Sequence, residues 1–152
     1  MKYLFALIML SSCAPRPAII VDTDFIGYLS KFKSLYDVTD QVSIKKSVLK
    51  LPLIGQCDLD NNQVTIDETF WKNATDLSKT ALIYHELGHC LLYRAHTEQV
   101  KSDGCPSSLM FNVIADDDCL AVHMEEYLTE MKEHQNTLLV RGITGNLYPA
   151  FK

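Results

Sequence analysis

Hydrophobic positions in the first quarter of the chain recur at steps of three and four residues. Those positions are Phe25, Ile26, Leu29, Phe32, Leu35 and Tyr36. This spacing places them on one face of an α-helix. The pattern therefore predicts a helix with a buried stripe, and Asp22 or Thr23 can cap its start.

Shorter hydrophobic runs follow and predict strands. The segment 41–51 contains Val42, Ile44, Val48 and Leu49 and is closed by Pro52. Two further runs, 55–59 and 63–67, flank Asp60-Asn61-Asn62. Asx residues tolerate turn geometry, so these two runs predict a β-hairpin.

Two long helices complete the pattern. The first is predicted over 77–93, with Asp76 or Ser78 as its cap, and the residues before it, including 69–71, are read as a connecting loop. The second is predicted over 116–134. Its acidic start, Asp116-Asp117-Asp118, complements the helix dipole. We prefer this interpretation of the three carboxylates to a calcium site. No element is predicted from Leu138 onwards. The expected fold class is α+β, with a small mixed sheet packed on the first and motif-bearing helices and the last helix below.

The N-terminus has the layout of a secretory signal. Lys2 is followed by an apolar run over 3–10 and then by Ser11-Ser12-Cys13. The run is shorter than the about 20 residues that span a bilayer. Leu10-Ser11-Ser12-Cys13 resembles the lipobox of bacterial lipoproteins. The resemblance implies a signal peptide over 1–12, a lipidated Cys13 that anchors a tether over 13–21 to a membrane of the bacterial cell envelope, and a domain over 22–152 facing out of the cytoplasm.

Length and charge narrow the class of protein. Removal of residues 1–12 leaves 140 of the 152 residues, enough for one domain with its own core. It also leaves 13 basic and 19 acidic residues, a net charge of −6. An acidic chain without a basic patch gives no indication of nucleic-acid binding.

Four cysteines remain after Cys13. They are Cys57, Cys90, Cys105 and Cys119. An even number in an exported chain predicts two disulfides. Three pairings are open, and we favour Cys57–Cys90 with Cys105–Cys119. A zinc–thiolate cluster is the alternative, but the chain has no C-x-x-C pair.

The motif with the most specific chemistry is His85-Glu86-x-x-His89. Two histidines four residues apart share one helix face, so both imidazoles can bind one zinc ion. The adjacent Glu86 can accept a proton from water as general base. A catalytic zinc site needs a third protein ligand.

The motif resembles that of the metzincin zinc peptidases, H-E-x-x-H-x-x-G-x-x-H. Here Leu92 replaces the turn glycine, and the third histidine comes one residue late, as His96. In an unbroken helix, His96 would lie about 16 Å along the axis from His85. If His96 is the third ligand, the helix must end near Tyr93 and the chain must fold back.

A second metzincin feature is the Met-turn beneath the metal. Ser107-Ser108-Leu109-Met110 is similar to it and precedes the last helix, as in that family. The resemblance covers about 41–135 and implies a zincin-like fold and peptidase activity. It also implies that peptide substrates dock along an edge strand of the sheet. We expect residues 63–67 to form that edge.

Other ligands and another class of function remain open. In the gluzincin group a downstream glutamate completes the site, and Glu125 or Glu126 is the candidate, with His123 a further one. A zinc-binding envelope lipoprotein that acts as an interaction module, without turnover, is the alternative function. Glu86 argues against it, because a purely structural site needs no base.

Overall fold

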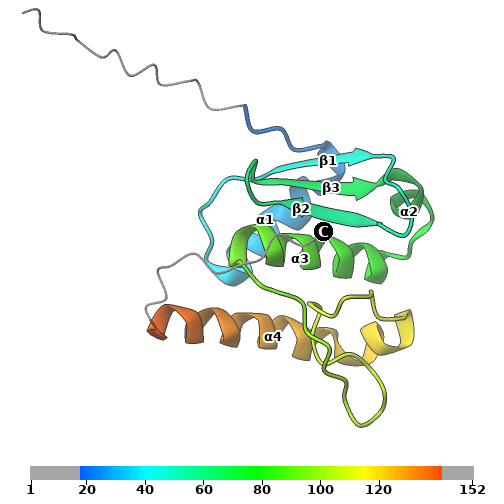
Figure 1. Ribbon diagram of the computed structural model, residues 1–152, viewed down its shortest axis with the longest axis vertical. Helices are drawn as coiled ribbons and strands as arrows, with labels where there is room; N and C mark the ends of the chain where they lie inside the picture. The colour runs from blue at the N-terminus through cyan, green and yellow to red at the C-terminus, as the bar shows by residue number, and fades with distance from the viewer. Residues whose placement is uncertain (1–17, 142–152) are drawn as a thin grey trace, which may run out of the picture.

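The computed structural model describes the main chain of residues 18–141 and the side chains of residues 18–133. Its elements form stacked layers (Figure 1): the sheet lies uppermost, helix α3 lies below it, and helix α4 lies below α3. The chain is thus a small mixed α+β protein. The proposed signal peptide and Cys13 lie outside the described residues.

The sheet has three strands, β1 (Ser43–Ser47), β2 (Gly55–Asp58) and β3 (Gln63–Asp67). Strand β3 is central, because β1 pairs with it in parallel and β2 pairs with it in antiparallel orientation. The predicted hairpin is confirmed, and the predicted first strand is shorter than 41–51. Ile20 and Val21 add backbone contacts beside β1.

The expectation that residues 63–67 form a sheet edge is wrong. Strand β3 has neighbours on both sides, so its backbone groups are already paired. The edge next to the motif helix is β2, and α3 contacts both β2 and β3. The hairpin could be read from local sequence, but the parallel pairing of β1 with β3 joins segments far apart in the chain.

The first helix begins as a short 3-10 turn over Thr23–Phe25 and continues as α1, Ile26–Tyr36. Its predicted caps are wrong, since no side chain caps either segment. The Asp22 carboxylate instead accepts a hydrogen bond from the Lys46 backbone N–H at 3.0 Å. Phe32 and Tyr36 are buried as the hydrophobic spacing predicted.

A short helix, α2 (Glu68–Asn73), stands where a loop was expected. Asp67 caps it: one carboxylate oxygen accepts from the Phe70 N–H at 2.9 Å, and the other accepts from the Leu49 N–H at 2.9 Å. Its Trp71 packs edge-on against Phe25, with ring centroids 4.6 Å apart. The buried aromatic pair fixes α2 to the start of α1.

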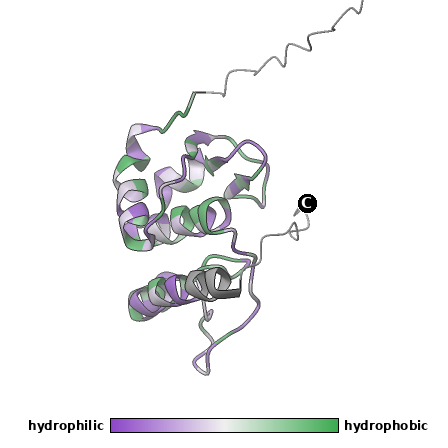
Figure 2. Ribbon diagram, turned by 90° about the vertical axis from the view of Figure 1, so that its left-hand side faces the viewer, coloured by the Kyte–Doolittle hydropathy of each residue, from purple (hydrophilic) through white to green (hydrophobic). Residues whose placement is uncertain are grey.

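Helix α3 (Asp76–Leu92) carries the His-Glu motif. Thr75, rather than Asp76 or Ser78, caps it and accepts from the Ser78 N–H at 3.1 Å. The helix lies between the sheet and α4, and its second half is buried almost throughout. Figure 2 shows hydrophobic positions on both helices, and α4 also carries many hydrophilic ones.

The last helix, α4, spans Asp117–Arg141 and is longer than predicted. Asp116 stands before it, and its carboxylate accepts from the Cys119 N–H at 2.8 Å. Among its residues with described side chains, Leu120, Tyr127 and Met131 are the buried hydrophobic ones. Within the described residues, no helix is long and apolar enough to cross a membrane.

Both favoured disulfides are confirmed. Cys57–Cys90 joins β2 to α3, with Cα atoms 5.7 Å apart. Cys105–Cys119 joins the loop before α4 to the first turn of α4, with Cα atoms 5.6 Å apart. The first bridge therefore connects the sheet to α3, and the second connects the long loop between α3 and α4 to α4 itself.

Replacing either cysteine pair by serine should destabilise the protein. The bridges close loops with sequence separations of 33 and 14 residues. Loop-closure entropy then predicts losses of about 3.7 and 3 kcal/mol, respectively. Urea unfolding of the Cys57→Ser/Cys90→Ser and Cys105→Ser/Cys119→Ser variants measures them, and unchanged midpoints would contradict the prediction.

Candidate metal centre

The site depends on a chain reversal at the end of α3. Tyr93 adopts a left-handed conformation (φ 52°, ψ 36°) and ends the helix. The N–H groups of Tyr93 and Arg94 both point to the Gly88 carbonyl. The helix therefore ends near Tyr93, as a metal ligand at His96 requires. The residue with positive φ, Tyr93, comes one position after Leu92, where the metzincin motif has its glycine.

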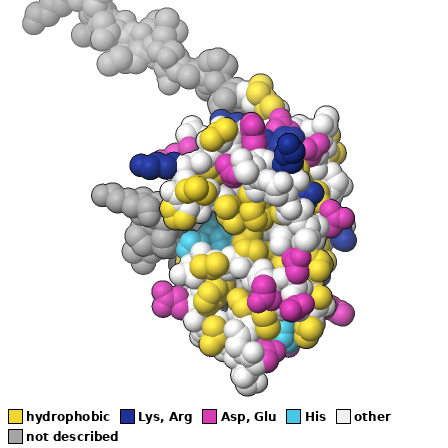
Figure 3. Space-filling model, turned by 90° about the vertical axis from the view of Figure 1, so that its right-hand side faces the viewer, with side chains coloured by type: hydrophobic (Ala, Val, Ile, Leu, Met, Phe, Trp, Pro, Cys, Tyr) yellow, Lys and Arg dark blue, Asp and Glu magenta, His cyan; other side chains and the backbone are white. Residues whose placement is uncertain are grey.

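The reversal brings three imidazoles together. The Nε2 atom of His85 lies 3.0 Å from that of His89 and 3.1 Å from that of His96, and the remaining pair is 3.0 Å apart. His85 is buried, His89 is half-buried and His96 is exposed. The site therefore opens to one side, and Figure 3 shows a group of histidine side chains in a hollow of the surface, flanked by hydrophobic side chains.

Backbone carbonyls orient two of the three rings. The Nδ1 atom of His85 lies 2.6 Å from the Leu109 oxygen, and that of His89 lies 2.6 Å from the Arg94 oxygen. A carbonyl only accepts, so in each ring Nδ1 carries the proton. Burial lowers the pKa of His85 to about 3 and that of His89 to about 4. Both rings are therefore neutral at pH 7, with the Nε2 lone pair facing the other ring.

This donor set fits a cation. Two Nε2 lone pairs 3.0 Å apart cannot hydrogen-bond to each other, and His96 can donate a proton to only one of them. Nitrogen ligands about 2.0–2.1 Å from a tetrahedral ion are about 3.3 Å from one another. The three spacings are close to that value, so His85, His89 and His96 form a group that could hold a metal ion.

Glu86 lies between α3 and the edge strand β2. Its side chain is buried, and burial raises the pKa of its carboxyl to about 8. A Cβ placed on Gly55 of β2 would stand 2.5 Å from Glu86 Oε1. The absence of a side chain at Gly55 therefore leaves room for this carboxyl against β2.

Met110 lies beneath the motif helix, where the Met-turn resemblance predicted a methionine. It is fully buried, and a Cβ on Gly88 would stand 2.6 Å from its sulfur. The Met110 carbonyl accepts from the Thr97 N–H at 2.8 Å. The turn is thus bonded to the segment that carries His96.

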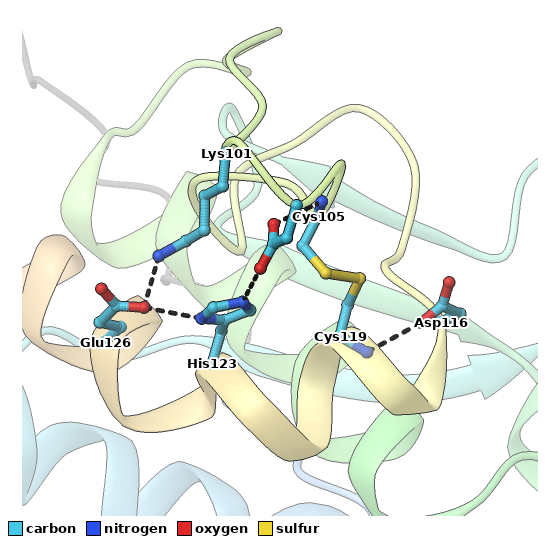
Figure 4. Close-up of a disulfide and its surroundings, with 7 residues drawn as sticks. Lys101, Cys105, Asp116, Cys119, His123 and Glu126 are labelled. Carbon is cyan, nitrogen blue, oxygen red and sulfur yellow. Dashed lines mark hydrogen bonds and ion pairs between the residues drawn. A yellow bond between two sulfur atoms is a disulfide. The ribbon is translucent and has the colours of Figure 1, made fainter.

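The other candidate ligands lie elsewhere. Glu126 contacts Lys101 and His123, and the second nitrogen of His123 lies 2.7 Å from Asp103 (Figure 4). Glu125 is exposed on the same helix. Within the described residues, neither glutamate belongs to the three-histidine group. A second group, formed by Asp103, Cys105 and His123, includes a sulfur already bound to Cys119.

Sequence reasoning missed the residues that support the histidines. Leu109 and Arg94 act through their carbonyls, which no side-chain pattern reveals. Gly55 at the start of a hairpin strand was a weak signal for a close approach. Glu130 pairs with Arg94 at 2.6 Å, a contact that no local pattern in the sequence indicates.

Comparison with protein-family models, with curated proteins and with solved structures finds no match for this chain.

Metal binding should require His96 and not the glutamates of α4. His96→Ala removes one of three converging nitrogens, and we expect the affinity for Zn²⁺ to fall by more than about 100-fold, beyond the usual loss from an outer-shell change. Competition with a chromophoric chelator measures it. Glu125→Ala and Glu126→Ala are the controls and should keep the wild-type affinity for Zn²⁺. If one of these variants loses Zn²⁺ and His96→Ala does not, the assignment of the third ligand is wrong.

Proposed function

We propose that this protein is a zinc-dependent peptidase. The observation that carries the proposal is the convergence of three imidazoles in a site open to solvent on one side, with a buried glutamate directly after the first histidine in the sequence. Three protein nitrogens leave a coordination position for water or substrate, which is the mark of catalytic rather than structural zinc sites. The fit to an ion is a property of the donor set, and zinc is our choice because imidazole ligands in this motif suit it.

His85, His89 and His96 would hold the ion. Bound zinc lowers the pKa of water to about 7 and polarises a carbonyl group. Glu86 has the role of base: its carboxylate accepts the proton of the attacking water and passes it to the departing amine. Burial alone favours the protonated form of Glu86. A neighbouring dication favours the ionised form, so metal binding would prepare this residue to accept a proton.

Strand β2 is the candidate docking edge for the substrate. One side of β2 pairs with β3, and the sheet ends at its other side. An extended peptide could add there through main-chain hydrogen bonds. The Glu86 carboxyl lies against Gly55 of the same strand. A peptide aligned on β2 would therefore pass close to the proposed base.

We also propose that the enzyme acts in the bacterial cell envelope, held by a lipid on Cys13. This part of the proposal depends on the signal-like run and the Leu10-Ser11-Ser12-Cys13 junction in the sequence. Two disulfides in the folded part agree with an oxidising compartment.

Glu86→Gln should separate metal binding from catalysis. Glutamine keeps the size of the side chain but cannot accept the proton. We expect full zinc content by atomic absorption and a fall in peptide hydrolysis of about 10²–10⁴-fold. If the variant cleaves every peptide at the wild-type rate, Glu86 is not the base and the proposed mechanism is wrong. If the wild type binds zinc and cleaves none, the chain is a metal-binding module without turnover.

Gly55→Ala tests the placement of the Glu86 carboxyl. The new Cβ would meet Glu86 Oε1 at 2.5 Å and Leu82 at 2.8 Å, so the carboxylate must move. A misplacement of this size should lower kcat/KM by roughly 10–100-fold, with zinc still bound.

Gly27→Ala in α1 is the matched control, because nothing lies within 4 Å of the position of its Cβ. It should leave activity unchanged. If both alanine variants have equal activity, the lack of a side chain at Gly55 is not needed to place the Glu86 carboxyl.

A further inference from the structure

Glu130 of α4 is bonded to two different segments that border the metal centre. Its Oε1 accepts from the Arg94 guanidinium at 2.6 Å. Its Oε2 accepts from the Ser108 hydroxyl at 2.6 Å. One carboxylate thus joins the segment after α3 to the Met110 turn.

Each of these segments supplies the carbonyl that orients one histidine. The carbonyl of Arg94 itself accepts from His89, at 2.6 Å. The carbonyl of Leu109, next to Ser108, accepts from His85, also at 2.6 Å. The Ser108 hydroxyl also accepts from the Met110 N–H at 3.0 Å, so it holds the peptide group that contains the Leu109 carbonyl.

The ion pair with Glu130 fixes the segment that contains Arg94, because the Arg94 side chain is buried. That side chain is only 5% exposed. Within the part of the chain whose side chains are described, its Nη1 has no hydrogen-bond partner. A buried guanidinium that loses its carboxylate is an uncompensated charge, and the segment must shift to expose it to water. Such a shift would carry the Arg94 carbonyl away from His89 and move His96, two residues further along.

We propose that Glu130 is a positioning residue for the metal centre, acting through Arg94 on His89 and His96 and through Ser108 on His85. The inference depends on the proposed metal site. It assigns α4 a part in the geometry of all three ligands, although no side chain of this helix belongs to the three-histidine group. Outer-shell partners of this kind fix the tautomer and the ring orientation of metal-binding histidines.

Titration with Co²⁺ tests the proposal, since the visible spectrum of Co²⁺ reports ligand geometry independently of activity. The variants are Glu130→Gln and Ser108→Ala in the purified protein. Glu125→Gln, on the exposed side of the same helix, and Ser107→Ala, next to Ser108, are the matched controls. We expect the two variants to bind Co²⁺ about 10–100-fold more weakly with an altered d–d spectrum, and the controls to match the wild type.

Folding is checked in each variant by the thermal transition and by intact disulfides. Folded variants with wild-type affinity and spectrum would overturn the positioning role. If Glu130→Gln does not fold, Ser108→Ala decides, because it leaves the Arg94–Glu130 pair intact. A wild-type protein that binds no Co²⁺ would instead overturn the proposed metal site itself, and the positioning role with it.

Discussion

The left-handed turn at Tyr93 is the constraint on which the rest of the site depends. A continued helix would carry His96 about 16 Å along the axis from His85, whereas the two Nε2 atoms lie 3.1 Å apart. A residue with a Cβ adopts this conformation at a cost of about 1–2 kcal/mol. Two backbone N–H groups that converge on the Gly88 carbonyl help to offset the cost. Glycine is therefore not required at the turn when the flanking hydrogen bonds are made.

Gly88 serves the site on two sides of the helix. Its carbonyl receives the N–H groups of the turn, and its missing side chain leaves room for the sulfur of Met110 and the methyl group of Met131. The Met110 turn can then approach α3 closely enough for the Leu109 carbonyl to reach His85. The packing of two methionines against a glycine thus determines the tautomer of a buried imidazole.

Local patterns in the sequence predicted much of this structure. The hairpin and the motif helix with its end near Tyr93 agree with the prediction, because each depends on spacing within a short stretch. The even number of cysteines predicted two disulfides, and the favoured one of the three pairings is confirmed. The expected edge position of residues 63–67 was wrong, since β1, from an earlier segment of the chain, pairs with the other side of β3. Helix α2 was missed because it has only six residues, too few for a helical period to stand out.

The candidate site likewise contains residues that the sequence predicted and residues that it did not. Its three histidines and Glu86 follow from one motif and one geometric requirement. Their supports do not, because carbonyl groups are present in every residue and the Arg94–Glu130 pair joins positions 36 residues apart. A salt bridge of this kind is visible only when the fold brings its partners together, and its value depends on burial that the sequence does not report.

Covalent and ionic links also explain how so small a sheet can hold such a site. Three short strands bury little surface around a helix whose ends must stay fixed. Cys57–Cys90 ties the edge strand to α3 one residue after His89, so strand and ligand move together. Cys105–Cys119 ties the loop that leads to the Met110 turn to α4. Further along α4, Glu130 bonds both to that turn and to Arg94. Each segment that bears a ligand or its orienting carbonyl is therefore held by a bond to a second layer, in addition to its own packing.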